Sequence, residues 1–259
     1  MSNSNQNPHH SFYLFYCKAL HWNVMDYQKE KIQFPSITPA SDRSIMLRFE
    51  DGISEYIHEH VFYFHTLLVK KFKKKIANTS PAYNSILIRL ADGVSVWRMI
   101  AKLKQLFEEG HEISIAQEQT VKIPVCYDKE FALDIDRVSK HTKLSTDEII
   151  HLHTKGKYLV YFLGFSPGFP YIGGMNQKLE TPRLDSPRVE VMQGSVAIGG
   201  KQTGIYPITS PGGWNIIGRT PLILFDWNKI SNPILPMGAR IQFYAISHKE
   251  FSQHQGTLF

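Results

Sequence analysis

Cysteine is scarce in this sequence, and long apolar runs are missing. Its 259 residues include two cysteines, Cys17 and Cys126, and no Cys-x-x-Cys pair, which excludes a disulfide framework and the common zinc patterns. No run approaches the roughly 20 apolar residues that a membrane-spanning helix needs. The apolar segment 12–17 lacks the basic flank and the cleavage site of a signal peptide. We therefore expect a cytoplasmic protein with no membrane partner.

Several motifs of self-contained enzymes are also missing. The sequence has no Gly-x-x-x-x-Gly-Lys-Ser/Thr phosphate loop, and segment 199–204, which superficially resembles one, has the wrong spacing and no helical pattern after it. The metalloprotease motif His-Glu-x-x-His does not occur. His151 and His153 lie close together, but no further ligands stand at a suitable spacing, so we expect no metal site. These absences disfavour a nucleotide-dependent enzyme that acts alone.

The net charge is positive, but its distribution has a simple explanation. Much of the formal charge of +6 comes from the run Lys70-Lys71-Phe72-Lys73-Lys74-Lys75. This run follows an apolar stretch of helical periodicity, at the end where positive charge complements the helix dipole. We interpret it as a solvated helix end rather than an anion-binding patch, and we expect no nucleic-acid partner.

Residues 37–127 have the pattern of a small α+β domain. Strand-like alternation and helical spacing of apolar residues take turns along this region. The order β-α-β-α-β predicts a ferredoxin-like sandwich, although other small α/β units also fit it. The predicted elements, in chain order, are strand 44–49, helix 54–72 (with Ser54 as N-cap), strand 85–90, helix 96–107 and strand 121–127.

Residues 1–36 are predicted to form an N-terminal extension that is partly disordered. The first ten residues are rich in Asn, Ser, Gln and His, which cannot bury much apolar area. Because Met25 precedes the α+β pattern closely, residues 1–24 are interpreted either as an added segment or as the product of an upstream start.

Residues 128–259 begin with two helical segments and then change character. Helical patterns cover 131–143 and 146–154, with Ser145 as the predicted N-cap of the second. Many short apolar runs separated by Gly and Pro follow, and these predict a β-barrel or a sandwich. The runs are 158–163, 189–191, 195–198, 214–217, 222–225 and 241–246.

Two stretches rich in glycine and proline organise this second region. Residues 164–174 read Gly-Phe-Ser-Pro-Gly-Phe-Pro-Tyr-Ile-Gly-Gly, and residues 198–221 contain a further six glycines and three prolines. Glycine serves where φ is positive or where another group approaches the backbone closely, and proline fixes φ. We therefore predict rigid loops that carry binding or catalytic groups.

These stretches resemble a known protein family. They are similar to the family that contains the B subunit of bacterial 5-oxoprolinase, the kinase inhibitor KipI and subunit 1 of allophanate hydrolase. The resemblance runs from about residue 37 to the C-terminus and implies a cyclophilin-like β-barrel for 128–259. The expected fold class is thus α+β, a ferredoxin-like sandwich followed by this barrel. The matching motifs are Phe165 to Tyr171, Pro182-Arg183 with Pro187-Arg188, Gly194-Ser195-Val196, Gln202 to Pro207, and Ser210 to Trp214 with Gly218 to Pro221.

The resemblance implies one component of an ATP-dependent hydrolase complex that opens the lactam 5-oxo-L-proline to L-glutamate. It implies A-like and C-like partner subunits, a small amide or lactam substrate, and ATP bound or used by the complex. Two alternatives stay open. One is an inhibitor of a sensor histidine kinase, which would then be the partner, and the other is a component of the allophanate hydrolase and urea carboxylase pathway.

Three residues are the catalytic candidates. The resemblance places a histidine at His153, and an imidazole suits acid-base or anchoring work near neutral pH, although a helix-capping role is equally open. Gln202 both donates and accepts hydrogen bonds, which suits a lactam, and Tyr206 follows in the same motif. Because side chains alternate along a strand, Gln202 and Thr203 should point to different faces.

The remaining candidates are assigned to substrate binding. Aromatic residues inside the glycine-rich turns are expected to wall a pocket, and serines without a nearby base are expected to donate hydrogen bonds rather than attack. Arg183 and Arg188 suit a carboxylate or phosphate, with ion pairs to Asp185 or Glu190 as the alternative. The full set is Phe169, Tyr171, Arg183, Arg188, Ser195, Thr203, Ser210 and Trp214.

Overall fold

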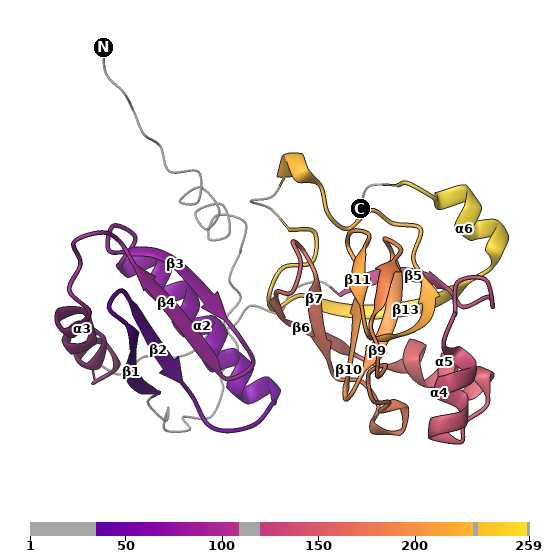
Figure 1. Ribbon diagram of the computed structural model, residues 1–259, viewed down its shortest axis with the longest axis horizontal. Coiled ribbons are helices and arrows are strands. Elements are labelled where there is room, and N and C mark those ends of the chain that lie inside the picture. Colours follow the sequence, from indigo (N-terminus) through magenta and orange to yellow (C-terminus); the bar gives the residue numbers. More distant parts are fainter. Residues whose placement is uncertain (1–34, 109–119, 230–232, 258–259) are drawn as a thin grey trace, which may run out of the picture. The chain divides into compact units, whose positions relative to one another are not determined.

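The structure of the protein, a computed structural model, describes residues 35–108, 120–229 and 233–257 (Figure 1). These residues fall into two units, 35–108 and 120–257. The predicted extension 1–36 lies almost wholly outside the described residues, and so does Cys17. In the described part of the chain, no helix is both long enough and apolar enough to span a membrane.

A four-stranded antiparallel sheet and two helices make up the first unit. Its strands lie in the order β1-β2-β4-β3. Ile45 in β2 is opposite Ile88 in β4, and both lie on the buried face of the sheet, against which the helices pack. The elements are β1 (Ser36–Ser41), β2 (Ser44–Arg48), α2 (Glu55–Lys71), β3 (Ile76–Pro81), β4 (Ser85–Leu90) and α3 (Val96–Glu108).

The helices of this unit begin and end close to their predicted positions. The Ser54 side chain caps α2 by accepting a hydrogen bond from the Ile57 N–H. Lys70 and Lys71 occupy the last turn of the same helix. The lysine run therefore begins at a helix C-terminus, as expected from the sequence, where its charge complements the helix dipole.

The element order of the first unit corrects the sequence reasoning, which predicts β-α-β-α-β. The observed order is β-β-α-β-β-α. The two orders differ because the sequence reasoning misses the edge strands β1 and β3 and adds strand 121–127. Each of them contains a proline (Pro39 or Pro81) and lacks apolar alternation, features that edge strands tolerate. Strands β2 and β3 flank β4 and are joined by α2, which is a split β-α-β arrangement. The ferredoxin-like assignment itself stays a prediction.

Seven strands of the second unit close into a barrel, which confirms the predicted β-barrel. Their order is β10-β7-β6-β13-β5-β12-β9. Outside the barrel, β8 (Arg188–Val191) and β11 (Ser210–Gly212) form a separate two-stranded sheet. The barrel strands are β5 (Val121–Cys126), β6 (Tyr158–Leu163), β7 (Pro170–Gly173), β9 (Ser195–Gly199), β10 (Gln202–Ile205), β12 (Asn215–Arg219) and β13 (Arg240–Ile246).

Strand β5 corrects the predicted domain boundary at residue 127. The sequence reasoning gives 121–127 to the first unit, but β5 pairs in parallel with β13, from Val121 opposite Ile241 to Cys126 opposite Ile246. The apolar pattern of residues 121–127 is compatible with a strand of either unit. The pairing with β13, near the end of the chain, shows that this strand belongs to the second unit. The predicted strand 222–225 also differs, since it lies outside the barrel strands.

Three helices accompany the barrel, and the capping predicted for one of them is confirmed. Helix α5 (Thr146–Lys155) starts at a capping box in which Ser145 and Glu148 bond each other's backbone N–H groups. Helix α4 (Ile135–Thr142) precedes it, and α6 (His248–His254) follows β13. Buried residues of α4 and α5, such as Val138 and Ile149, join the apolar core of the barrel.

Glycines on the outer face of the barrel make room for aromatic rings. Ile198 in β9 faces the barrel core, so Gly199 faces outward. A Cβ atom on Gly199 would lie 2.4 Å from the Trp214 indole, and one on Gly204 in β10 would lie 2.9 Å from the Phe169 ring. Both rings therefore rest directly on the strand backbone. They belong to a second buried cluster, distinct from the barrel core, that contains Phe169, Val191, Ala197, Tyr206, Trp214 and Ile216.

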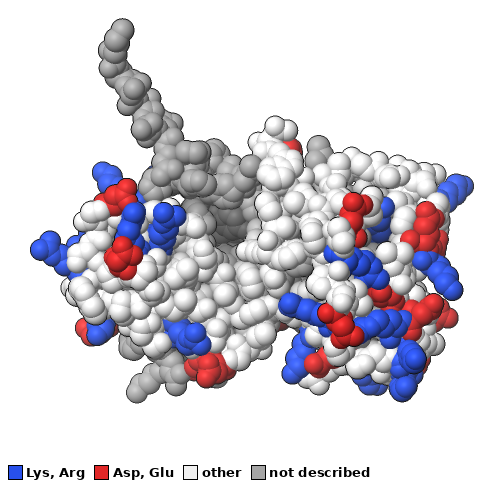
Figure 2. All heavy atoms as spheres, in the orientation of Figure 1, with Lys and Arg blue, Asp and Glu red and all other residues white. Residues whose placement is uncertain are grey.

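Charged side chains of both signs are interspersed on the visible face of the second unit (Figure 2). A field of a single sign is what drives non-specific binding to nucleic acid. This face of the second unit therefore carries no field of a single sign.

We predict that Gly199→Ala destabilises the protein by about 1–3 kcal/mol, because the added methyl group overpacks the contact with Trp214. The measurement is the free energy of unfolding in urea. Gly213→Ala is the matched control, since a Cβ there meets Pro187 at an ordinary 3.6 Å. Equal stability of the two variants would contradict the close packing of the indole on β9.

Candidate functional site

Phe169 stands at the centre of an aromatic cluster on the outer barrel face. Its ring centroid lies 5.3 Å from Tyr171, 5.2 Å from Tyr206 and 5.5 Å from Trp214. All three contacts are edge-to-face, which is a favoured geometry for aromatic pairs. We call these four residues the aromatic platform. Phe169, Tyr206 and Trp214 are buried and Tyr171 is half-buried, so the platform is packed, and the prediction that Phe169 and Trp214 wall an open pocket is corrected.

The first glycine-rich loop presents Phe165 above this platform. The Ser166 N–H donates to the Gly164 carbonyl (2.8 Å), and Phe165 between them has a φ of 65°. This is a γ-turn with a positive central φ, which is rare and strained for a bulky residue. A turn with Pro167 and Gly168 at its centre follows, closed by the Phe169 N–H on the Ser166 carbonyl (3.1 Å). The loop holds the Phe165 side chain 64% exposed.

Arg183 lies at the edge of the platform, where its charge acts on the Tyr206 hydroxyl. The Arg183 guanidinium carbon lies 5.5 Å from the centre of the Trp214 ring, within range of a cation–π contact. Burial raises the pKa of the Tyr206 hydroxyl, and the Trp214 backbone, Arg183 and Arg188 oppose part of that rise. The hydroxyl is therefore protonated at neutral pH and stands in the field of two cations.

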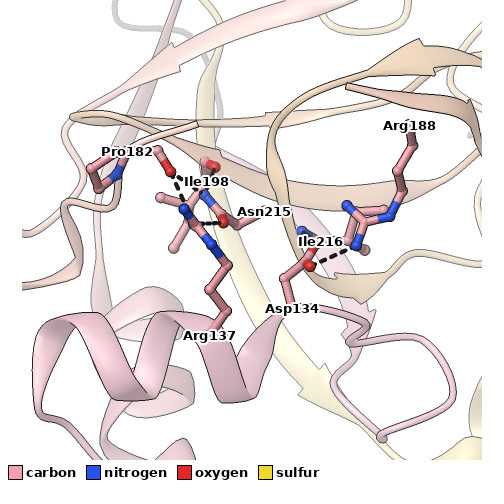
Figure 3. Close-up of polar contacts among 7 residues, drawn as sticks. All are labelled: Asp134, Arg137, Pro182, Arg188, Ile198, Asn215 and Ile216. Atoms are coloured by element: carbon pink, nitrogen blue, oxygen red, sulfur yellow. Dashed lines mark hydrogen bonds and ion pairs between the residues drawn. The ribbon is translucent and has the colours of Figure 1, made fainter. Parts of the chain in front are cut away.

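Arg188 is partly buried and forms an ion pair with the buried Asp134, the residue before helix α4 (Figure 3). Its Nη2 lies 2.6 Å from Asp134 Oδ1, and Asp134 Oδ2 accepts the Ile216 N–H at 2.7 Å. The Asp134 side chain is 7% exposed. Breaking one partner of such a pair costs about 3–5 kcal/mol, since the other charge stays buried. The sequence predicts Asp185 or Glu190 as the alternative ion-pair partner, whereas for Arg188 the observed partner is Asp134.

Arg137, one turn further along α4, makes a second set of contacts (Figure 3). It donates to the Pro182 carbonyl at 3.1 Å and to the Asn215 side-chain oxygen. Asn215 in turn donates to the carbonyls of Pro182 (2.9 Å) and Ile198 (3.0 Å). Helix α4 thus ties the segment before β8 to strands β9 and β12.

His153 lies inside the barrel unit and is fully enclosed, which corrects its prediction as a catalytic or helix-capping group. Tyr127 donates to its Nδ1 at 2.7 Å, and its Nε2 lies 3.1 Å from the Thr203 hydroxyl. Because Thr203 donates to the Ala197 carbonyl (3.0 Å), Nε2 carries the ring proton. Burial lowers the pKa of His153 to about 3. A neutral imidazole with both nitrogens engaged is a structural group.

The other candidates divide between the barrel interior, the outer face and the small sheet. Thr203 points inward to His153, whereas Gln202 alternates to the outer face, opposite Gly199. This separation of Gln202 from Thr203 agrees with the predicted alternation. Ser195 is buried at the start of β9, and Ser210 begins β11 in the small sheet.

The structure therefore brings together the aromatic residues, Tyr206 and both arginines, and it separates His153 and Thr203 from them. Asp134, Arg137 and Asn215 support this arrangement and are missed by the sequence reasoning. Their partners lie 45 to 82 positions away in the chain, and no local spacing reveals such pairs. The one available signal is an Asp and an Arg three residues apart on a short helix, which is common on helix surfaces.

A family model described as carboxyltransferase domain, subdomain C and D matches residues 35–235. The chain belongs to this family. The match spans both units, and it contains the whole of the aromatic platform and both arginines. Family membership confirms the resemblance drawn from the motifs.

Two curated relatives and one solved structure extend this comparison. The chain is 35% identical over 233 residues to the B subunit of 5-oxoprolinase from Bacillus subtilis, covering 85% of this chain and 96% of that protein. It is 43% identical over 145 residues to the B subunit of 5-oxoprolinase from Haemophilus influenzae, covering 56% and 68%. The crystal structure of TTHA0988 superposes with a TM-score of 0.69 at 32% identity over 79% of this chain. This chain spans 40% of that longer one.

We predict that His153 makes the stability of the protein depend on pH. Its pKa is about 3 in the fold and about 6.5 in the unfolded chain. Between these values the unfolded state binds more protons, so the free energy of unfolding falls as the pH is lowered, by up to about 1.4 kcal/mol per pH unit for this group.

The measurement compares urea unfolding of the wild type and of His153→Gln from pH 7 to pH 5. The stability advantage of the wild type over His153→Gln should shrink as the pH falls. A difference that stays constant from pH 7 to pH 5 would refute the buried neutral imidazole.

Proposed function

We propose that this chain is the B-type subunit of a 5-oxoprolinase complex, which opens 5-oxo-L-proline to L-glutamate at the expense of ATP. The observation that carries the proposal is the match to the Bacillus subtilis protein named as the B subunit of 5-oxoprolinase, over 96% of that protein. An alignment of 233 residues includes both units of this chain. The kinase-inhibitor role and the allophanate pathway stay alternative hypotheses.

ATP binding is assigned to the partner subunits, because the described residues of this chain do not fit a phosphate loop. Segment 199–204 runs from the end of β9 through a turn into β10, and the turn consists of Gly200, at a φ of 63°, and the exposed Lys201. A phosphate loop instead leads from a strand into a helix, whose N-terminus holds the phosphates. ATP would supply activation of the unreactive lactam carbonyl, and the A-like and C-like partners would supply the groups that use it.

The part of this chain that we assign to the shared site is the outer face of the barrel around the aromatic platform. Tyr171 and Phe165 offer partly exposed aromatic surface for a small apolar ring. Tyr206 and Gln202, which are buried in the structure of this chain, are the hydrogen-bonding groups that we assign to the amide, and Arg183 adds positive charge. Backbone N–H groups of the glycine-rich loops are the candidate donors to the oxygen of the opening lactam. His153 and Thr203 lie in the interior of the barrel unit, where their hydrogen bond links α5 to β10.

The proposal predicts that the isolated chain is inactive and that the complex is active. Co-expression with the A-like and C-like proteins of the same organism, followed by a glutamate-release assay, measures this directly. We expect release of glutamate that requires ATP and all polypeptides. Turnover by this chain alone would overturn the partner requirement, and an inactive, correctly assembled complex would overturn the proposed substrate.

A pair of tyrosine variants tests where the site lies within the complex. Tyr206→Phe keeps the ring in the platform and removes only the hydroxyl, so kcat/KM should fall by about 10-fold or more as a hydrogen bond to the substrate is lost. Tyr244→Phe is the matched control, since Tyr244 is an exposed residue of β13. Equal activity of the two variants would remove Tyr206 from the site.

A further inference from the structure

The backbone around Arg183 is fixed to the barrel on both sides. Ahead of it, Thr181 and Gly200 form an isolated bridge with hydrogen bonds of 3.3 and 2.8 Å. The Pro182 carbonyl accepts from both Asn215 and Arg137. After it, the Leu184 N–H donates to the Gly213 carbonyl at 2.7 Å. Both peptide groups next to Arg183 are held in this way, so the start of its side chain is fixed in place, which lowers the entropy cost of binding a ligand.

The Arg183 side chain itself remains exposed and lies over the Trp214 ring. Among the residues that the structure describes, no carboxylate pairs with it. A cation–π contact uses the charge of the guanidinium without an acceptor atom, so the N–H groups of the Arg183 side chain are still available to a planar anion. The contact with Trp214 thus orients the charge without neutralising it.

Arg188 differs from Arg183 because a carboxylate already neutralises its charge. Asp134 compensates its charge at 2.6 Å, and that carboxylate also accepts the Ile216 N–H. Arg188 therefore anchors the small sheet to α4 and β12. Of the two arginines beside the platform, only Arg183 has an uncompensated charge and an exposed side chain.

We propose that Arg183 binds the carboxylate of the substrate and thereby selects lactams that carry a carboxylate next to the ring nitrogen. The inference rests on the proposed function and adds to it the residue that determines specificity. A carboxylate matches the guanidinium fork with two parallel hydrogen bonds. The ring of the same ligand would then lie beside the platform, where Tyr171 is half-buried and its ring centroid is 5.9 Å from that of Trp214.

Two lactams that differ only in the carboxylate provide the test. The assembled complex is assayed with 5-oxo-L-proline and with 2-pyrrolidinone, which has the same ring without the acid. Arg183→Gln should raise KM for 5-oxo-L-proline by about 10- to 100-fold, the effect of losing a charged hydrogen bond, with a much smaller change in kcat. Any activity on 2-pyrrolidinone should be unchanged. Arg183→Lys should restore part of the affinity, because it keeps the charge but not the fork.

Arg98→Gln is the matched control, since Arg98 is an exposed arginine of the first unit, and it should behave as the wild type. Unfolding midpoints of all variants should stay close to that of the wild type, because the Arg183 side chain is exposed and contacts the Trp214 ring from outside. An unchanged KM for 5-oxo-L-proline in Arg183→Gln overturns the inference and leaves the proposed function intact.

If the complex does not hydrolyse 5-oxo-L-proline, the proposed function fails, and calorimetric binding to the full-length chain decides the inference separately. Tighter binding of 5-oxo-L-proline than of 2-pyrrolidinone, with the difference abolished in Arg183→Gln, supports carboxylate recognition. Equal binding of both lactams by the wild type, or binding of neither, overturns it.

Discussion

The seating of two aromatic rings on bare strand backbone is the constraint on which the candidate site depends. Trp214 and Phe169 contact β9 and β10 where Gly199 and Gly204 have no side chain. A larger residue at either glycine would lift its ring away from the barrel. Tyr171 contacts both rings and Arg183 contacts that of Trp214, so the position of the rings on the strands determines where both side chains lie on the outer face. Close approach of a ring explains these two glycines, since neither has a positive φ.

Helix α4 provides the second constraint, because it carries the polar groups that hold the segment around Arg183 against the barrel. Asp134 takes up the charge of Arg188 and the N–H of Ile216, while Arg137 reaches the Pro182 carbonyl. These contacts join a helix at the start of the second unit to strands near its middle. The two arginines therefore differ in role. Arg188 stabilises the fold through its ion pair with Asp134, whereas the charge of Arg183 is available to a ligand.

The sequence predicts most local elements of the second half, and it fails where distant segments meet. The helix cap at Ser145 follows from a short-range pattern, and the short strands follow from apolar runs between glycines and prolines. His153 is misassigned, because an imidazole near a candidate loop looks the same whether it faces solvent or, as here, Tyr127 and Thr203. The strand 121–127 is placed in the wrong unit for the same reason, since its partner β13 lies at the other end of the chain.

The central claim is that the outer barrel face around the aromatic platform is half of a site that a partner polypeptide completes. Hydrogen–deuterium exchange of this chain, alone and in the assembled complex, tests it most directly. The account predicts slower exchange in the complex for the loop 164–168 and for the segment 183–187, next to the platform. Unchanged exchange in both segments, with protection confined to residues 35–108, would contradict it.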